Sequence, residues 1–224
     1  MVVRIKGLTL SLFINSAYSS YGFCSAFVYG SQGVGKTTYA LKVLYGVYGD
    51  WDKVLENTYF YIDNLIPRLK DCVKSGKRIK AILLDDAGVW LIKYHWRKDF
   101  SVWFSKLFNL IRTICSGIIF TSVEVSDIVK FVRDKVQYRV SIRVIDNLTR
   151  EAIGYRVITL PTLERIVKRW FIDRFRLDLP GDVRKEYEEM RKEAIERLMS
   201  DVEGKRERGK EVDVDLGDVR ELIE

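Results

Sequence analysis

Histidine and cysteine are scarce in this chain, and their scarcity excludes several kinds of site. The 224 residues include one histidine, His95, and three widely separated cysteines, Cys24, Cys72 and Cys115. No Cys-x-x-Cys pair occurs, so the usual zinc sites cannot be assembled. An odd, sparse set of thiols favours a reducing compartment, so we expect a cytoplasmic protein with these thiols in its core.

Long apolar runs are also missing. No run reaches the length that spans a bilayer, so we expect no membrane partner. The first residues, MVVRIKGLTLSLFINSA, match a signal peptide poorly because Asn15 and several serines break the apolar stretch, and we predict a strand there. Glutamine occurs only twice while charges are plentiful, which is typical of a source that lives at high temperature.

Charge is unevenly distributed along the chain. Residues 1–160 carry 23 Lys and Arg against 13 Asp and Glu, a net of +10, whereas residues 161–224 carry a net of −3. A basic body suits a polyanionic partner such as DNA or RNA, although lysine and arginine also solvate ordinary surfaces.

The stretch FVYGSQGVGKTTYA, residues 27–40, matches the phosphate-binding loop G-x-x-x-x-G-K-[ST]. An apolar run of strand character precedes the loop at 26–29, and apolar residues at helical spacing follow it. Glycines let successive N–H groups point inward as an anion nest, and the following helix adds the positive end of its dipole. Lys36 is placed to reach the β- and γ-phosphates, and Thr37 to ligate Mg²⁺. The predicted nucleotide site comprises Gly30, Ser31, Gln32, Gly33, Val34, Gly35, Lys36, Thr37 and Thr38.

Strand and helix patterns alternate after this loop. Strands are predicted at 58–62, 79–84 and 117–120, and helices at about 63–74, 99–115 and 126–135. A β-hairpin is predicted from 138–145 and 152–160. This order predicts an α/β fold, a mainly parallel doubly wound sheet with helices on both faces.

Pro161 marks a change in pattern. We expect a P-loop ATPase core at 1–160, a C-terminal helical extension at 161–203, and a flexible linker with an acidic tail at 204–224. The extension is predicted to contain an amphipathic helix over 163–171 and a charged helix over about 183–198. These helices either cap the domain or bind a partner protein, and the tail is either a docking segment or solvated.

A second signal is the run AILLDD, residues 81–86, in which four apolar residues end in paired carboxylates. Such a strand supplies the magnesium-side acid of P-loop enzymes. Asp85 is the candidate that holds Mg²⁺ through water, and Asp86 the candidate that orients and polarises the attacking water. The alternative is a turn that merely ends a strand.

GSQGVGKTT together with AILLDDAG resembles the P-loop ATPases whose catalytic acid follows the metal-binding acid, a group that includes AAA+ and RecA-like proteins. The Asp-Asp ending is similar to helicase-loader and transposition-helper ATPases. It is also similar to small ATPases of archaeal viruses and plasmids, in which Asp-Asp-Ala-Gly precedes Trp; here Val89 intervenes before Trp90. The resemblance covers residues 25–145.

The resemblance implies further site residues. It makes 117–122 the strand between the two catalytic strands, with Thr121, and next Ser122, as the group that senses the γ-phosphate. Many relatives carry Asn there, and a strand-end threonine without a function is the alternative. It also implies an arginine supplied by a neighbouring subunit, and hence a homo-oligomer. Arg133 is the first candidate, with Arg139 and Arg143 as rivals.

We therefore expect a Mg²⁺-dependent ATPase that acts on DNA or a DNA-bound complex. The absence of Asn-Lys-x-Asp argues against guanine-specific chemistry. A nucleotide or small-molecule kinase and a slow nucleotide-dependent switch stay open as alternatives. Residues 90–98 interleave aromatic and cationic side chains, which either stack on nucleic-acid bases or pack an irregular loop.

Overall fold

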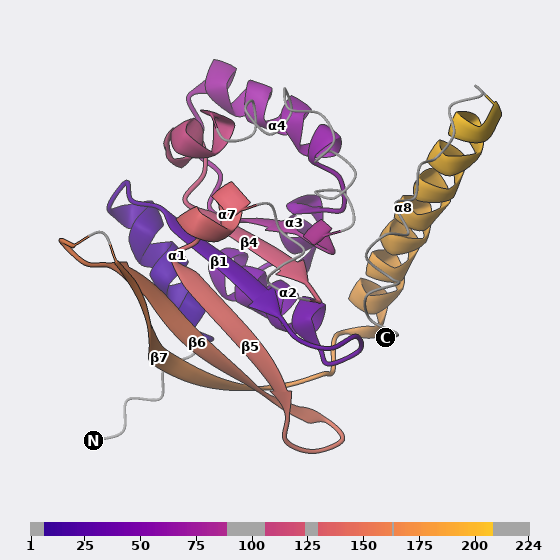
Figure 1. Ribbon diagram of the computed structural model, residues 1–224. Coiled ribbons are helices and arrows are strands. Elements are labelled where there is room, and N and C mark those ends of the chain that lie inside the picture. Colours follow the sequence, from indigo (N-terminus) through magenta and orange to yellow (C-terminus); the bar gives the residue numbers. More distant parts are fainter. Residues whose placement is uncertain (1–6, 89–105, 124–129, 163, 208–224) are drawn as a thin grey trace, which may run out of the picture. The chain divides into compact units, whose positions relative to one another are not determined.

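The computed structural model describes residues 7–88, 106–123, 130–162 and 164–207. The chain forms two compact units, Met1–Arg184 and Lys185–Glu224. The first unit is built on a seven-stranded sheet with the order β2-β3-β4-β1-β5-β6-β7 (Figure 1). In the described residues, no helix combines the length and the apolar character that crossing a bilayer requires.

Five strands of the sheet are parallel, as the sequence predicts. Each pairs in parallel with its neighbours in the order β2-β3-β4-β1-β5, and β6 and β7 continue the sheet in antiparallel pairing. The predicted hairpin is confirmed as β5 and β6. The strands are β1 (Cys24–Tyr29), β2 (Thr58–Tyr59), β3 (Ile82–Leu84), β4 (Gly117–Ser122), β5 (Tyr138–Val144), β6 (Thr149–Thr159) and β7 (Arg165–Arg176).

Helices cover both faces of the sheet, so the predicted doubly wound α/β class is confirmed. On one face lie α1 (Thr9–Ser19) and α2 (Lys36–Tyr48), side by side in Figure 1. On the other face, Phe108, from the helical residues 106–110, packs on Phe120 of β4 with ring centroids 6.2 Å apart. The carbonyl of Lys135, at the end of α7 (Lys130–Lys135), accepts a hydrogen bond from Ser25 Oγ at 3.5 Å. Between sheet and helices lies a core of fully buried side chains that includes Tyr39, Leu41, Leu44, Ile82 and Phe120.

The strand predicted at the N-terminus is wrong, because residues 9–19 form α1. Leu10, Ile14 and Ala17 are buried on one side of this helix at positions i, i+4 and i+7. Two further helices lie between β1 and β3. The helix predicted at 63–74 is confirmed as α4 (Ile62–Ser75), and the sequence analysis did not identify α3 (Trp51–Glu56), which Asp50 caps through its side chain.

The helix predicted over 163–171 is also wrong, because 165–176 form β7. This strand pairs with β6 along its whole length, with a register shift at Gly154 and Tyr155. Its buried residues Phe171, Asp173 and Phe175 alternate with exposed ones, the period of a strand with one face covered. The segment predicted to begin a helical extension therefore belongs to the sheet.

The extension becomes helical at Gly181, where α8 (Gly181–Glu207) begins. This confirms the charged helix predicted over 183–198 but corrects the start of the flexible linker, since α8 continues through 204–207. Glu, Lys and Arg favour a helix, and the single Gly204 costs only about 1 kcal/mol there.

Several predictions concern residues outside the described part of the chain. They are the aromatic and cationic stretch at 90–98, the first half of the helix at 99–115, the start of the helix at 126–135, and the tail after 207.

Candidate nucleotide-binding site

The predicted phosphate loop joins the carboxyl end of β1 to the first turn of α2. Gly30 and Gly35 have φ values of 148° and 103°, a region that side chains rarely adopt. A Cβ on Gly30 would lie 3.1 Å from Val34 Cγ1, and one on Gly35 would lie 2.5 Å from Leu177 Cδ2. Both positions therefore favour glycine for backbone conformation, and a side chain at either would also crowd a neighbouring side chain.

The ammonium group of Lys36 is folded over this loop. Its Nζ donates hydrogen bonds to the carbonyl oxygens of Gly30 at 2.8 Å and Ser31 at 3.0 Å, and the residue is buried. Ser31, Gln32 and Gly33 form the exposed outer part of the loop, and Thr37 and Thr38 are half-buried in the first turn of α2. A cation beside backbone N–H groups at a helix N-terminus is a suitable setting for a phosphate chain.

Thr37 and Asp85 meet although 48 residues separate them. The Thr37 hydroxyl lies 3.1 Å from each carboxylate oxygen of Asp85, which is fully buried directly after β3. Hydroxyl and carboxylate oxygens are hard ligands of the kind Mg²⁺ takes alongside phosphate oxygens and water. This pair of donors therefore fits the predicted magnesium ion.

Thr121 lies near the carboxyl end of β4, which separates β1 from β3 as the resemblance implies. Its buried hydroxyl donates a hydrogen bond to Asp85 Oδ1 and accepts one from the backbone N–H of Asp86 at 2.9 Å. Thr121 thus positions both acids. Its predicted contact with a γ-phosphate stays a prediction, as does the same role for Ser122, which is buried beside it.

Asp86 is half-buried, with a left-handed backbone at φ 46°. A non-glycine residue in this region is uncommon, and surrounding contacts must hold it there. The hydrogen bond from its N–H to Thr121 is one such contact. Asp86 therefore turns out of the strand direction immediately after Asp85.

Arg133, the first candidate for the predicted arginine, is not brought to this loop within the chain. Arg133 lies half-buried on α7, near the end where Lys135 contacts Ser25, close to the amino end of β1. The loop leaves β1 at its carboxyl end, so Arg133 lies toward the opposite edge of the sheet from the phosphate loop of its own chain. Its rivals both lie on β5, where the backbone of Arg139 is opposite Tyr155 of β6 and that of Arg143 is opposite Glu151. Arg143 follows Ile142, whose carbonyl oxygen would lie 3.3 Å from a Cβ on Gly30, so its backbone adjoins the loop.

Arg150 of β6 was not predicted from the sequence as part of the site, and it supports the phosphate loop through its guanidinium. Its buried guanidinium donates a hydrogen bond from Nε to the Val34 carbonyl at 3.1 Å. Its Nη1 donates to the carbonyls of Thr149, at 3.0 Å, and Asp146. Nothing in the local sequence marks this arginine, since the contact depends on how β6 is placed in the sheet.

A second missed group is the buried carboxylate of Asp173 on β7. It accepts hydrogen bonds from the Tyr39 hydroxyl of α2 at 2.9 Å and from the Thr9 hydroxyl at the start of α1 at 2.6 Å. Burial and the nearby carboxylate raise the pKa of Tyr39 well above its usual value. The phenol therefore stays protonated and links the helix that carries Lys36 to the far end of the sheet.

Comparison with known proteins finds relatives from archaeal viruses and similar solved structures. The chain is 34% identical over 212 residues to the uncharacterized protein B-251 of Sulfolobus spindle-shape virus 1, covering 88% of this chain and 84% of that protein. It is 28% identical over 188 residues to the uncharacterized protein ORF286 of Acidianus two-tailed virus, covering 80% of this chain and 63% of the relative. The crystal structure of the KaiC-like protein PH0186 from Pyrococcus horikoshii OT3 matches 67% of this chain and 92% of its own, with a TM-score of 0.40 and 15% identity. No protein-family model matches the sequence.

Proposed function

The chain belongs to the family of protein B-251 of Sulfolobus spindle-shape virus 1, and we propose that it is a Mg²⁺-dependent ATPase that acts on DNA or a DNA-bound complex. One observation carries the proposal. Thr37, next to Lys36 in the phosphate loop, lies within 3.1 Å of both oxygens of Asp85. Two sequence motifs 48 residues apart thus form a single site.

The phosphate chain of ATP is bound by backbone N–H groups of residues 31–36 and by the N-terminus of α2. On binding, Lys36 exchanges its hydrogen bonds to the Gly30 and Ser31 carbonyls for phosphate oxygens. Thr37 and Asp85 would hold Mg²⁺, which would supply positive charge to offset that of the β- and γ-phosphates.

Asp86 acts as the base that orients and polarises the attacking water. Its carboxylate follows the metal-side acid directly, and its backbone is fixed through Thr121. Thr121 fixes the positions of Asp85 and Asp86 relative to each other, because its hydroxyl contacts both residues. Two acids held in fixed positions beside the phosphate loop support a role in the attack of water on a γ-phosphate.

The positive charge of the chain supports nucleic acid as the molecule on which the protein acts. The chain has a formal net charge of +7, and the excess lies in residues 1–160. Arg133 on α7 completes the site of a neighbouring copy, so efficient hydrolysis requires an oligomer.

Steady-state ATP hydrolysis, measured with and without nucleic acid, tests this function. We expect turnover to need Mg²⁺ and to rise when DNA is added. The stimulation should be lost as salt increases, because released counterions drive DNA binding. The mass of the complex should increase in the presence of ATP.

Three outcomes would contradict the proposal. Unchanged turnover with every DNA and RNA added would exclude a nucleic-acid client. Transfer of labelled phosphate to an added acceptor rather than to water would make the protein a kinase. A stoichiometric, slowly exchanging nucleotide with negligible turnover would make it a switch.

A further inference from the structure

A cleft of about 540 Å³ lies at the edge of the sheet where the parallel strands begin. Residues from α3, from α4 and from the segment leading into β3 line it, and Tyr18 of α1 and Tyr48 of α2 contribute two aromatic rings. The phosphate loop leaves the opposite edge, at the carboxyl end of β1. The six residues of β1 separate the two edges by roughly 20 Å.

The cleft is strongly basic. Residues 68–80, RLKDCVKSGKRIK, hold six cations and one acid, the densest basic stretch of the described chain. Four of these cations line the cleft, Arg68, Lys77, Arg78 and Lys80, and Lys53 of α3 adds a fifth. Two lining acids, Glu56 and Asp71, leave a net charge of +3. Such a concentration of charge attracts a polyanion.

Two exposed aromatic rings stand beside these cations. The Arg78 guanidinium lies 5.6 Å from the centre of the Tyr21 ring, and Lys80 Nζ lies 5.6 Å from the centre of the Tyr18 ring. Tyr21 is 83% exposed and has a left-handed backbone at φ 52°. A large ring presented to solvent from a strained position, next to fixed charge, provides a surface for stacking.

Arg78 has a structural role that accounts for only part of this pattern. Its guanidinium donates hydrogen bonds to the carbonyls of Arg112 at 3.0 Å, Tyr18 at 3.4 Å and Gly22, which ties the end of α1 and the turn after it to the 3-10 helix at 111–113. That role explains neither the exposed cations Arg68 and Lys77 nor the exposed rings.

We propose that this cleft, which we call the amino-edge cleft, binds single-stranded nucleic acid. Arg68, Lys77 and Lys80 contact phosphates, and Tyr18 and Tyr21 stack on bases. The inference rests on the nucleic-acid client of the proposed function, and it names the surface that holds this client. Because the cleft and the phosphate loop lie at opposite edges of the sheet, the single-stranded nucleic acid and ATP bind without competing.

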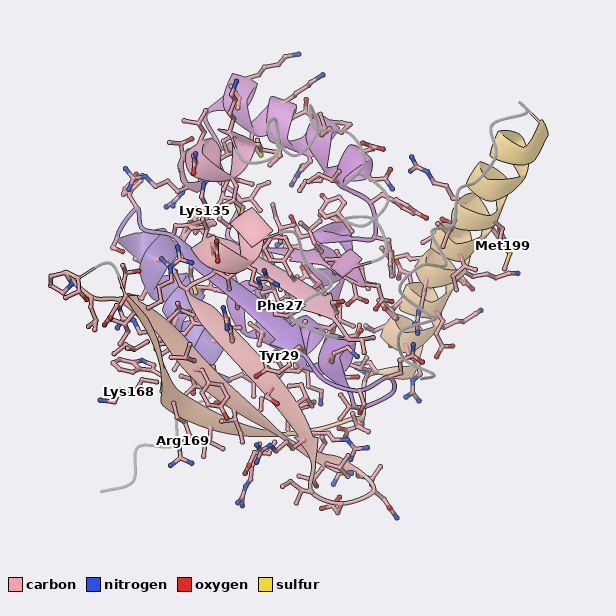
Figure 2. The ribbon with its side chains drawn as sticks, in the orientation of Figure 1. Phe27, Tyr29, Lys135, Lys168, Arg169 and Met199 are labelled. Atoms are coloured by element: carbon pink, nitrogen blue, oxygen red, sulfur yellow. The ribbon has the colours of Figure 1, made fainter. Side chains whose placement is uncertain are left out.

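Binding of a fluorescein-labelled oligodeoxythymidine, followed by fluorescence anisotropy without ATP, tests the proposal. The cleft variant is Arg68→Glu with Lys77→Glu. Its matched control is Lys168→Glu with Arg169→Glu on β7 (Figure 2), which makes the same change in charge on exposed residues. Strand β7 lies five strands from β3, about 24 Å at the usual strand spacing. Thermal melting and ATP binding show that each variant is folded.

We expect the cleft variant to bind at least roughly 10-fold more weakly, with a reduced dependence of affinity on salt, and the control to bind like the wild type. Tyr21→Asn, which tolerates the left-handed backbone but removes the ring, should weaken binding of the single strand about fivefold or more. Its affinity for duplex DNA should be unchanged. A matching oligouridine separates DNA from RNA as the preferred strand.

Equal affinity of the cleft variant and the wild type, or a loss confined to the β7 control, would overturn the proposal. If the wild type hydrolyses ATP but binds no single-stranded nucleic acid, the proposals of the cleft and of a nucleic-acid client are wrong, and the proposed ATPase activity is retained. If single-stranded nucleic acid binds through the cleft but ATP is not hydrolysed, the proposed ATPase activity is wrong and the proposed cleft is retained.

Discussion

Lys36→Ala is expected to weaken ATP binding at least about 100-fold, as measured by calorimetry with Mg²⁺ present, because it removes a charged donor from the phosphate site. In the structure this ammonium bonds to the Gly30 and Ser31 carbonyls, inside the loop that receives the phosphates. The loop itself should persist, because its glycines and the Arg150 contact with Val34 do not depend on Lys36.

Lys42→Ala is the matched control. It removes the same side chain from the same helix, where Lys42 forms an ion pair with Asp178 at 3.3 Å. A partly exposed ion pair contributes little to the stability of the fold, so this variant should stay folded and bind ATP like the wild type. Equal ATP affinity in Lys36→Ala and the wild type would exclude the phosphate loop as the ATP-binding site.

Asp86→Asn is expected to separate binding from chemistry. The amide keeps the size of the side chain but cannot accept a proton from water, so turnover should fall about 10²- to 10⁴-fold while nucleotide affinity is retained. Steady-state turnover and calorimetry on the same preparation measure the two effects. A loss confined to turnover is typical of a group that acts only in the transition state.

The control for this variant is Asp52→Asn, which neutralises an exposed acid in the first turn of α3. It should leave turnover unchanged. An undiminished rate in Asp86→Asn would exclude this carboxylate as the base. A loss of nucleotide binding in the same variant would instead assign Asp86 to the binding of the metal or the phosphates.

The sequence was sufficient to locate the phosphate loop and the acidic pair because both are local motifs. Gly30, Gly35 and Lys36 lie within seven residues, and each is needed for a conformation or a charge that the motif itself specifies. The Asp85–Asp86 pair follows an apolar run that is long enough to be a buried strand. The placement of β4 between β1 and β3 followed from the family resemblance, and the strand order confirms it.

Two elements were assigned to the wrong class because short apolar patterns are ambiguous. The segment over 163–171 has apolar residues at helical spacing, yet its partner is β6, and pairing with an existing strand outweighs a weak local preference. The N-terminal segment is rich in β-branched and aromatic residues, but it carries a buried helical stripe at Leu10, Ile14 and Ala17.

The supports of the site could not be found from local sequence. Arg150 contacts a carbonyl 116 residues away, and Asp173 accepts a hydrogen bond from a tyrosine 134 residues away. Each looks like an ordinary charged residue of a strand until the antiparallel pair β6–β7 is placed beside β5. Their positions depend on tertiary pairing and not on any motif.

The most direct test is a crystal structure with Mg²⁺ and a non-hydrolysable ATP analogue. We expect the triphosphate on the N–H groups of residues 31–36, with Lys36 Nζ moved from the Gly30 and Ser31 carbonyls to phosphate oxygens. The metal should lie between Thr37 and Asp85, whose side chains contact each other directly in the present structure. A triphosphate bound elsewhere, or bound while Lys36 keeps both carbonyl contacts, would contradict the account.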